Sequence, residues 1–222
     1  MSVVEQVRAA FHLLAINIEL DDARYQAAWR YLEVSYMNPL RSYHTMHHIA
    51  DGLRTAHEAD LHNVSGISMP LLSASWFFHD VIYDARSKQN EFESAMVAQA
   101  MLSGTSVAPR LEEMILATRH DGIRPATYEA QLLCDIDLAS LSTPDQHAFE
   151  LASHQIREEY SFVPNLAYAT VRLNIMGQFL LRAEAGRLYY TPIFNTSMRN
   201  GLAIANLLTE IARLNNVIRS AS

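Results

Sequence analysis

The sequence predicts an all-α protein, a single-domain bundle of many helices over residues 1–222. Apolar residues recur at spacings of three and four along nearly the whole chain, which is the period of an amphipathic helix. Only seven glycines and seven prolines interrupt this pattern, and no segment alternates apolar and polar residues as a half-buried strand would. Because half of its residues are apolar, a chain of this length can bury one sizeable core.

The apolar periodicity defines a series of expected helices. They cover residues 3–18, 22–37, 45–60, 69–83, 88–103, 108–120, 126–139, 144–160, 164–185 and 196–217. The segment GRLYYTPIF (186–194) is expected to be irregular or extended. No repeat, low-complexity tract or linker divides the chain. We therefore expect one domain, with a motif-bearing core at about 40–140 and the helices of about 144–217 packed on it.

Several helix ends carry recognisable signals. Asp21 or Asp22 is expected to cap the second helix, because a short side-chain oxygen can accept a hydrogen bond from a first-turn N–H. Thr143, with Pro144 in the first turn, is expected to begin the eighth helix, and Pro164 stands just ahead of the ninth. Stop signals follow three of the periodic stretches, at Asn38-Pro39, Gly104 and Gly122.

Composition limits the partners. The formal net charge of −7 gives no general electrostatic attraction for nucleic acid or for an anionic membrane. The single cysteine, Cys134, allows no intrachain disulfide. The first residues lack the basic and apolar regions of a secretory signal, and no apolar run reaches the roughly 18–20 residues of a membrane span. We expect a cytoplasmic protein; its apolar C-terminal helices could equally form a homodimer surface or an ordinary core.

Three histidines stand within five positions in the stretch SYHTMHHIADG, residues 42–52. On a helix, His44 and His48 would share a face because they are four residues apart, while His47 would point elsewhere. His47 is therefore expected to be a solvated residue of the helix surface.

A histidine and an aspartate stand side by side in an otherwise apolar stretch. The stretch LLSASWFFHDVIYD (71–84) places His79 and Asp80 near the end of an apolar helix. A buried carboxylate beside an imidazole is costly unless it is paired or bound to a metal ion. The pair therefore favours a built site over an exposed turn.

Two further acids, Asp135 and Asp137, stand inside the apolar helix that contains LLCDIDLASLS (132–142). Two helical residues that are two positions apart point about 200° away from each other. At most one of them can face a given site, and we expect the other to be solvated or to act as a local cap.

A histidine, a His-Asp doublet and a distant aspartate, all on helices, resemble the HD superfamily of metal-dependent phosphohydrolases. The ordered landmarks are RSYHTMHHI, WFFHDVIYD, NEFESA, CDIDLASL, IREEY and RNGLAIANLLTEI. They look like those of a bacterial HD-phosphohydrolase-like family, from about residue 40 to the C-terminus. The doublet alone is a weak motif, whereas the ordered set is specific. The resemblance implies an HD-domain bundle with His48, His79, Asp80 and Asp137 as metal ligands.

The chemistry of this ligand set fits the implied role. Two imidazoles and two carboxylates suit a divalent ion of borderline hardness, such as Mn²⁺, Fe²⁺, Co²⁺, Ni²⁺ or Zn²⁺, with Mg²⁺ as a further candidate and one or two ions in the site. Such a set leaves positions open for water and for a phosphate oxygen. A metal ion would also attract an anionic substrate to an acidic protein.

The order Tyr-His-x-x-x-His is similar to the first motif of cyclic-nucleotide phosphodiesterases, which are distant HD relatives. In those enzymes the later histidine is a ligand and the earlier one donates a proton to the leaving oxygen. The similarity implies that His48 is a ligand and that His44 is the general acid. Asp80 would contribute to catalysis by holding the metal ion.

Three residues near the motifs have open roles. Glu91, which matches the NE landmark, could act as a base or hold a water, or could simply be a carboxylate favoured at a helix N-terminus. Asp84 could line the same cavity or form a local cap. His120 could complete a second metal site, as extra histidines do in some HD proteins, or could merely stand at a favourable helix end.

Arginines are the expected substrate contacts, because a guanidinium binds phosphate oxygens bidentately. Arg41, Arg86 and Arg157 are the candidates. Arg157 lies in the landmark IREEY, where it could instead pair with neighbouring glutamates. The stretch NTSMRN lacks the acidic residue that the family pattern places before RN, so any pairing of that acid with an arginine is in doubt here.

The leading hypothesis is a metal-dependent phosphohydrolase that cleaves a small phosphoester, with a nucleotide as the best substrate class, by metal-activated water. One alternative is an HD-type di-iron oxygenase, which needs further histidines; His120 is the only obvious one. The other alternative is a non-catalytic sensor domain that binds a nucleotide or a metal ion.

Overall fold

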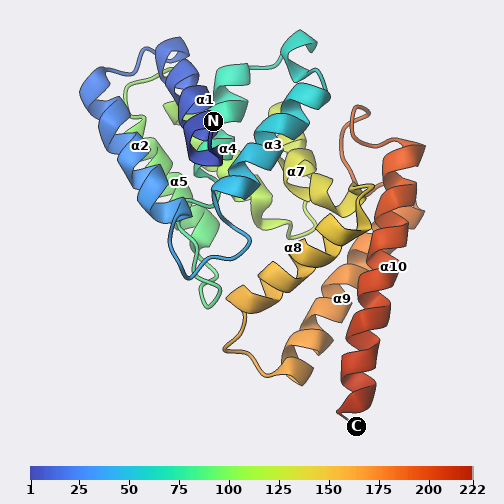
Figure 1. Ribbon diagram of the computed structural model, residues 1–222. Helices are drawn as coiled ribbons and strands as arrows, with labels where there is room; N and C mark the ends of the chain where they lie inside the picture. Colours follow the sequence, from blue (N-terminus) through green and yellow to red (C-terminus); the bar gives the residue numbers. More distant parts are fainter. Residues whose placement is uncertain (222) are drawn as a thin grey trace. The chain divides into compact units, whose positions relative to one another are not determined.

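The computed structural model describes residues 1–221, and within that range it contains helices and no strand, which confirms the all-α prediction (Figure 1). The chain divides into two compact units, Met1–Asp137 and Leu138–Ser222. The packing of the C-terminal helices on the core stays a prediction. None of the helices within residues 1–221 has the length and apolarity needed to cross a membrane.

The first unit is a bundle in which one helix packs against most of the others. Its elements are α1 (Val3–Asn17), α2 (Asp22–Tyr36), α3 (Met46–Glu58), α4 (Met69–Phe78), α5 (Asn90–Met101), α6 (Leu111–Leu116) and α7 (Tyr128–Asp137), with short 3₁₀ turns at Leu61–Asn63, Ala108–Arg110 and Ala117–Arg119. Helix α4 contacts α1, α3, α5, α6 and α7. It is therefore the central helix of this unit.

The sequence of α4 explains its place. Ser68 caps the helix by accepting a hydrogen bond from the backbone N–H of Leu71, and Pro70 stands in the first turn. The buried residues include Trp76, Phe77 and large aliphatic side chains on every side of the helix. A helix that is apolar all round must be covered on all faces. Residues that follow its last turn consequently start inside the core.

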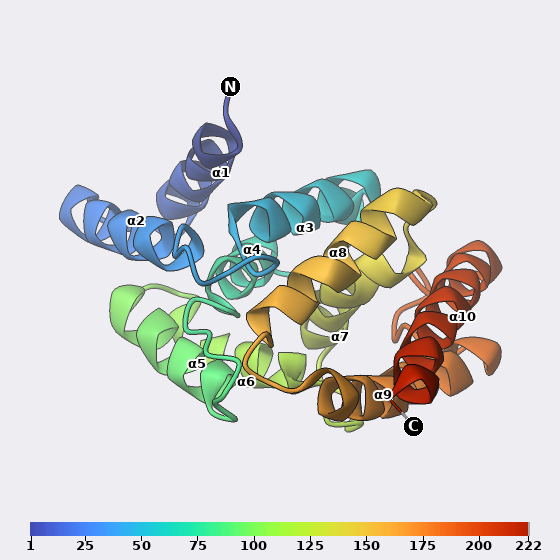
Figure 2. The ribbon, with the colours of Figure 1, turned by 60° about the horizontal axis from the view of Figure 1, so that its bottom comes forward.

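The second unit consists of α8 (Gln146–Glu159), α9 (Asn165–Glu184) and α10 (Ser197–Ser220), preceded by a 3₁₀ segment at Leu138–Ser142. Helices α9 and α10 pack side by side (Figure 2). The stretch between them is irregular, as expected for 186–194, and is held by a hydrogen bond from the Asn195 side chain to the carbonyl of Gly186.

Most expected helix ends agree with the structure. Asp21 caps α2, Pro164 immediately precedes α9, and Gly104 and Gly122 have the positive φ angles of 79° and 89° that favour glycine. The Thr143 prediction was wrong. Asp145 caps α8 instead, because its Oδ1 accepts hydrogen bonds from both His147 and Ala148.

Two helices are shorter than the periodicity predicts. Helix α4 stops at Phe78 rather than at residue 83, and α6 is limited to Leu111–Leu116 with a 3₁₀ turn on each side. Apolar side chains continue beyond Phe78, so the pattern does not change where the helix ends. The doublet His79-Asp80 therefore lies in the turn that closes α4 and not within the helix.

Candidate metal centre

The end of α4 carries two of the candidate ligands. His79 is the C-cap residue of α4 and is 1% exposed, and Asp80 follows it in the turn. The Nε2 atom of His79 lies 3.1 Å from Oδ2 of Asp80. Because α4 is the central helix, this contact lies inside the core, as the sequence analysis expects.

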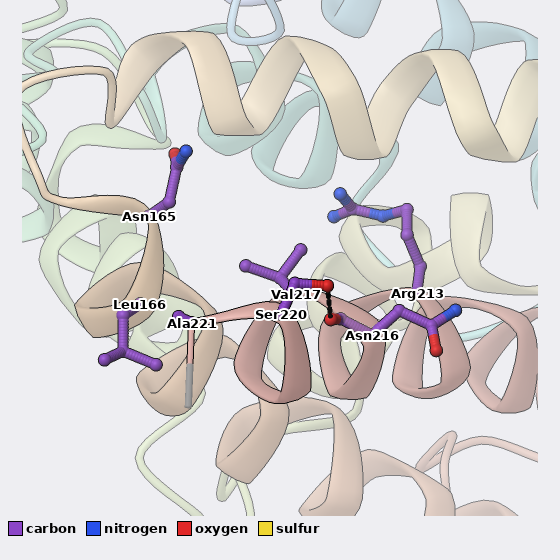
Figure 3. Close-up of a pocket in the computed structure, with 7 residues that line it drawn as sticks. All are labelled: Asn165, Leu166, Arg213, Asn216, Val217, Ser220 and Ala221. Carbon is purple, nitrogen blue, oxygen red and sulfur yellow. Dashed lines mark hydrogen bonds between the residues drawn. The ribbon is translucent and has the colours of Figure 1, made fainter.

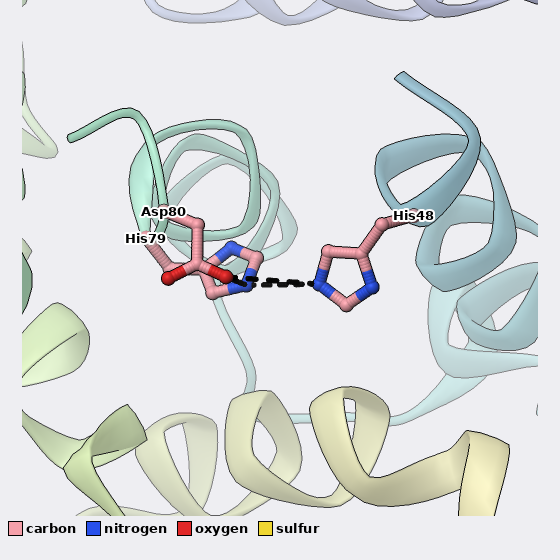
Figure 4. A group of neighbouring side chains, drawn as sticks. All are labelled: His48, His79 and Asp80. Atoms are coloured by element: carbon pink, nitrogen blue, oxygen red, sulfur yellow. Dashed lines mark hydrogen bonds and ion pairs between the residues drawn. The ribbon is translucent and has the colours of Figure 1, made fainter. Parts of the chain in front are cut away.

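Helix α3 supplies the second imidazole. Thr45 caps this helix, and His48 stands in its first turn with its side chain buried. The Nε2 atoms of His48 and His79 are 3.2 Å apart, and His48 Nε2 lies 4.0 Å from Asp80 Oδ2 (Figure 4). His48, His79 and Asp80 thus form a buried group that could hold a metal ion.

Asp137, the last residue of α7, reaches the same group. Its Oδ1 lies 3.5 Å from Nε2 of His48 and 3.7 Å from Nε2 of His79. The other carboxylate oxygen accepts a hydrogen bond from His120 at 2.7 Å. The fold therefore brings together the four ligands that the resemblance implies, while the role of Asp137 as the fourth ligand stays a prediction.

The tautomer of His79 is set by its own helix. Its Nδ1 lies 2.8 Å from the carbonyl oxygen of Trp76. A carbonyl only accepts hydrogen bonds, so Nδ1 carries a proton and Nε2 can present a lone pair to the group. The indole of Trp76 stacks on the imidazole with ring centres 4.4 Å apart and donates from Nε1 to the carbonyl of Ile49 in α3. Such outer contacts orient metal-binding histidines.

Three of the five distances between the candidate donor atoms are those expected for ligands of one ion, and the other two are slightly longer. The distances between the nitrogen and oxygen atoms of the candidate ligands are 3.1, 3.2, 3.5, 3.7 and 4.0 Å. Ligands about 2.0–2.2 Å from one ion in tetrahedral or octahedral geometry are separated from each other by roughly 3–3.6 Å. Two imidazole nitrogens with carboxylate oxygens also match ions of borderline hardness. The residues present could therefore hold a metal ion.

The two imidazoles have opposite charge preferences. Burial, followed by the nearness of His79, lowers the pKa of His48 to about 4. Burial also acts to lower the pKa of His79, but the Asp80 carboxylate and hydrogen bonds to Asp137 and Asp80 outweigh it, and the pKa is raised well above its ordinary value. Of the two imidazoles, His79 is therefore the one that carries a proton and a positive charge. A metal ion bound here would replace that proton.

The two carboxylates are held ionised despite their burial. Burial acts to raise the pKa of Asp80, but the nearby His79 and His44 hold it well below its usual range. Burial also acts to raise the pKa of Asp137, but hydrogen bonds from His120 and His79 hold it well below its ordinary value. Both side chains are thus ready to accept a cation at neutral pH.

His44 reaches the group from outside α3. Helix α3 begins at Met46, so the expectation that His44 and His48 share a helix face was wrong: the Thr45 cap separates them. His44 nevertheless places Nε2 3.7 Å from Oδ2 of Asp80, and its ring stacks on Tyr83 with centres 4.0 Å apart. His47 is exposed, which confirms the expectation for that residue.

His120 lies beside the candidate ligands. It adopts a left-handed conformation, with a φ of 51°, which a non-glycine residue rarely takes. Its Nε2 is bound to Asp137, and within residues 1–221 its buried Nδ1 has no hydrogen-bond partner. The side chain therefore holds Asp137, and its part in a second metal site stays a prediction.

Asp135 occupies a different environment from the one expected. Its side chain is fully buried, at 0% exposure. The expectation that it is solvated was wrong. Helix α7 packs against α3, α4 and α6, so the face that carries Asp135 is covered as well as the face that carries Asp137.

The turn that follows the His79-Asp80 doublet is held by hydrogen bonds to Asp84. Asp84 accepts a hydrogen bond from the backbone of Arg86, and its exposed side chain also pairs with the Arg86 guanidinium at 3.9 Å, which favours the local-cap interpretation. Asn90, at the start of α5, holds the turn by bonding both the N–H and the carbonyl of Asp84. Its neighbour Glu91 forms an ion pair with Arg119 at 3.7 Å, so a catalytic role for Glu91 stays a prediction.

The candidate substrate arginines differ in what they bind. Arg41 is buried, and its Nη atoms donate to the backbone carbonyls of His44, Asp80 and Val81. Arg157 belongs to the second unit, where it donates to the carbonyls of Tyr160 and Val163. Arg86 is largely exposed. Backbone contacts thus occupy Arg41 and Arg157, and phosphate binding by these three residues stays a prediction.

Two residues that support the site were not found from the sequence. Trp76 was interpreted only as part of an apolar flank, and Gly52 was not considered. A Cβ on Gly52 would stand 2.0 Å from the indole of Trp76, so only glycine lets α3 approach this ring. A glycine at a helix position that faces the core is the signal that could have revealed the contact.

Comparison of the chain with family models, with curated proteins and with solved structures found no match.

The second unit has a hollow of about 480 Å³ between the start of α9 and the end of α10 (Figure 3). It is lined by Asn165, Leu166, Arg213, Asn216, Val217, Ser220 and Ala221. The charge of Arg213 is already neutralised by two hydrogen bonds to the buried Glu210, each 2.7 Å long. The hollow gathers no set of catalytic or metal-binding side chains comparable with the group at the end of α4.

Proposed function

We propose that this protein is a metal-dependent phosphohydrolase that cleaves a small phosphoester, with a nucleotide as the best substrate class. The observation that carries the proposal is the pair of imidazole Nε2 atoms 3.2 Å apart, with the Asp80 carboxylate within 4.0 Å of both. This is a set of donors that suits a divalent transition metal better than an ordinary core contact.

Two groups of residues have different roles in this proposal: the metal ligands and the residues that orient them. His48, His79, Asp80 and Asp137 would hold the ion, which when bound would activate water, polarise the phosphoryl oxygens and offset their charge. The hydrogen bond from His79 Nδ1 to the Trp76 carbonyl keeps Nε2 turned inward. His120 orients Asp137 in the same way through its 2.7 Å contact. These outer contacts preorganise the ligands before a substrate arrives.

His44 is the proposed proton donor for the departing oxygen. It stands next to the ligand set without belonging to it, with Nε2 3.7 Å from Oδ2 of Asp80. Because Asp80 is held ionised, its carboxylate can orient the His44 imidazole through the 3.7 Å contact. His44 could then give its Nε2 proton to the departing oxygen of a phosphoester held by the ion.

The first test is the metal content of protein purified without a chelator, measured by elemental analysis. Asp80→Ala removes a proposed ligand, and Asp84→Ala is the matched control because Asp84 lies in the same turn and is exposed. We expect a stoichiometric transition metal in the wild type and the control, and a large loss in Asp80→Ala. Equal metal content in all three proteins, or no metal even after loading with Mn²⁺, Fe²⁺, Ni²⁺ and Zn²⁺, would contradict the proposal.

The second test separates hydrolysis from the alternatives. The metal-loaded protein is assayed for phosphate release from p-nitrophenyl phosphate and from a panel of nucleotides. We expect turnover that disappears in Asp80→Ala. His44→Gln should greatly reduce phosphate release from the nucleotides and should slow p-nitrophenyl phosphate hydrolysis less, because its leaving group needs little proton donation. Bound metal without turnover would favour the sensor alternative, and two irons with oxygen consumption would favour the oxygenase.

A further inference from the structure

We propose that Arg41 is a positioning residue that fixes His44 against the His79-Asp80 turn. The inference rests on the proposed function, in which His44 is the proton donor. Arg41 lies between α2 and α3 and is 9% exposed. Its Nη1 donates to the backbone carbonyl of His44 at 3.3 Å and to that of Asp80 at 2.8 Å. One nitrogen atom thus joins the segment of the proton donor to the segment of a metal ligand.

The second terminal nitrogen extends the same link. Nη2 of Arg41 donates to the carbonyl of Val81 at 3.0 Å, one residue beyond Asp80. The planar guanidinium meets all three carbonyls in one fixed geometry. A lysine ammonium is a compact charge on a flexible chain and cannot reproduce this fork. The distance between His44 and Asp80 therefore depends on the shape of the Arg41 side chain as well as on its charge.

Aromatic rings add a second link between Arg41 and the His44 imidazole. The Tyr83 ring stacks on His44 at 4.0 Å with an interplanar angle of 28°, and the guanidinium carbon of Arg41 lies 5.7 Å from the centre of the same ring. The Tyr36 ring stands 5.2 Å from the guanidinium carbon. Cation–π attraction of this kind adds to the hydrogen bonds that hold a buried arginine. Arg41 thus supports both the backbone and the ring of the proton donor.

Packing alone does not account for an arginine at this position. Removing a guanidinium from water is costly, and an apolar side chain of similar volume would avoid that cost. In the described part of the chain the buried Nε of Arg41 has no hydrogen-bond partner, so the cost is not fully offset. The bonds that Arg41 does make all hold the two segments of the candidate site in register.

The test uses the leaving-group dependence of hydrolysis by the metal-loaded protein. Phenyl phosphate needs proton donation to its departing oxygen far more than p-nitrophenyl phosphate does, because phenol is the weaker acid. We expect Arg41→Lys to slow phenyl phosphate by about tenfold more than p-nitrophenyl phosphate, since general acid catalysis contributes about 10²–10⁴-fold. In a His44→Gln background the same substitution should add no further difference between the two esters.

Tyr36→Phe is the matched control for lost stability. It removes the hydrogen bond from the Tyr36 hydroxyl to the carbonyl of Phe77, beside Arg41, and leaves the Arg41 bonds in place. We expect Tyr36→Phe to lower the melting temperature and to change the hydrolysis rates of the two esters by the same factor. An Arg41→Lys protein that behaves like this control, with both esters slowed by one common factor, overturns the inference.

A second readout does not depend on activity. The ring protons of His44 lie under the Tyr83 ring and should show an upfield ring-current shift in the ¹H NMR spectrum, assigned with His44→Gln. We expect Arg41→Lys to move these signals toward ordinary histidine positions and Tyr36→Phe to leave them unchanged. If the wild type hydrolyses neither these esters nor any nucleotide of the panel, the proposed function fails, and the His44 signals still decide the role of Arg41. Unchanged signals in Arg41→Lys overturn that role.

Discussion

Gly52 of α3 and Trp76 of α4 stand so close that a Cβ on Gly52 would lie 2.0 Å from Cζ2 of the indole. The same indole stacks on His79 and donates to the Ile49 carbonyl of α3. This contact sets how closely the helix with His48 approaches the helix that ends at His79. The spacing of the two imidazoles therefore depends on the absence of one methyl group.

Substituting Gly52→Ala should disturb both stability and metal binding. Trp76 is 2% exposed and packs against the His48 and His79 rings, so we expect the added methyl to separate α3 from α4. Overpacking of this kind costs about 1–3 kcal/mol. We expect a lower free energy of unfolding in denaturant titrations and a weaker affinity for Zn²⁺.

Gly201→Ala is the control for this prediction. Gly201 lies in α10, and no heavy atom among the described residues would meet its Cβ within 4 Å, leaving out its chain neighbours and its own helix backbone. Alanine is favoured over glycine in a helix by roughly 0.5–1 kcal/mol. This variant should be unchanged or slightly more stable, with wild-type metal affinity. Equal behaviour of the two variants would contradict the role assigned to the Gly52–Trp76 contact.

Metal binding should strengthen as pH rises. In the metal-free protein the raised pKa of His79 means that its proton stabilises the fold below the unfolded value of about 6.5, and that this contribution is lost as pH rises through the folded pKa. A metal ion must displace that proton. The pKa of about 4 for His48 means that this residue is already neutral. Near pH 7 we expect release of about one proton per ion.

Calorimetry in buffers of different ionisation enthalpy measures this proton count directly. Affinity should fall between pH 8 and pH 6, in the direction set by His79. The carboxylates should not contribute in this range, because the depressed pKa values of Asp80 and Asp137 keep them ionised. An affinity that is independent of pH, with no proton released, would argue against a metal ion at His79.

The His120→Asn variant separates two roles for that residue. If His120 only orients Asp137 through the 2.7 Å contact, the variant should keep its metal stoichiometry and lose about 10–100-fold in affinity, as is typical for an outer contact of a ligand. If His120 completes a second site, the stoichiometry should fall from two ions to one. Elemental analysis at saturating metal decides between these outcomes.

The two candidate caps of α8 should differ in their contribution to stability. Asp145→Ala removes an oxygen that accepts from two backbone N–H groups, and should lower the free energy of unfolding by about 1 kcal/mol. Thr143→Ala removes only a 3.3 Å contact with the N–H of Asp145 and should have a smaller effect. Thermal unfolding of both variants checks the order. A larger effect at Thr143 would favour the start expected from the sequence.

The sequence contains enough information for the helices and for the gathering of the candidate ligands. The period of apolar residues depends on the backbone alone, so α1, α2 and α9 lie within a residue or two of their expected ranges. The prediction that Asp135 and Asp137 point in different directions rests on helical geometry in the same way. These features are local, and local chemistry determines them.

Features that depend on neighbours distant in the chain could not be predicted. Whether Asp135 meets water depends on which helices cover α7, and periodicity within α7 does not report this. The hydrogen bonds from Arg41 to the carbonyls of Asp80 and Val81 depend on how the turn after α4 lies beside it, which the local sequence does not show. Gly52 gives no apolar signal at all, since its importance lies in the indole that packs against it.

The hydrogen bond between His79 Nδ1 and the Trp76 carbonyl has an evolutionary consequence. That carbonyl is one of the last in α4, where the helix has no N–H of its own left to satisfy it. The His79 imidazole therefore also caps the C-terminal end of α4. This contribution to folding does not depend on any catalytic activity. If the protein has the proposed activity, selection on folding would retain a histidine here even after that activity was lost. In divergent descendants of this chain, loss of His48 or Asp137 would then indicate loss of the proposed activity sooner than loss of His79.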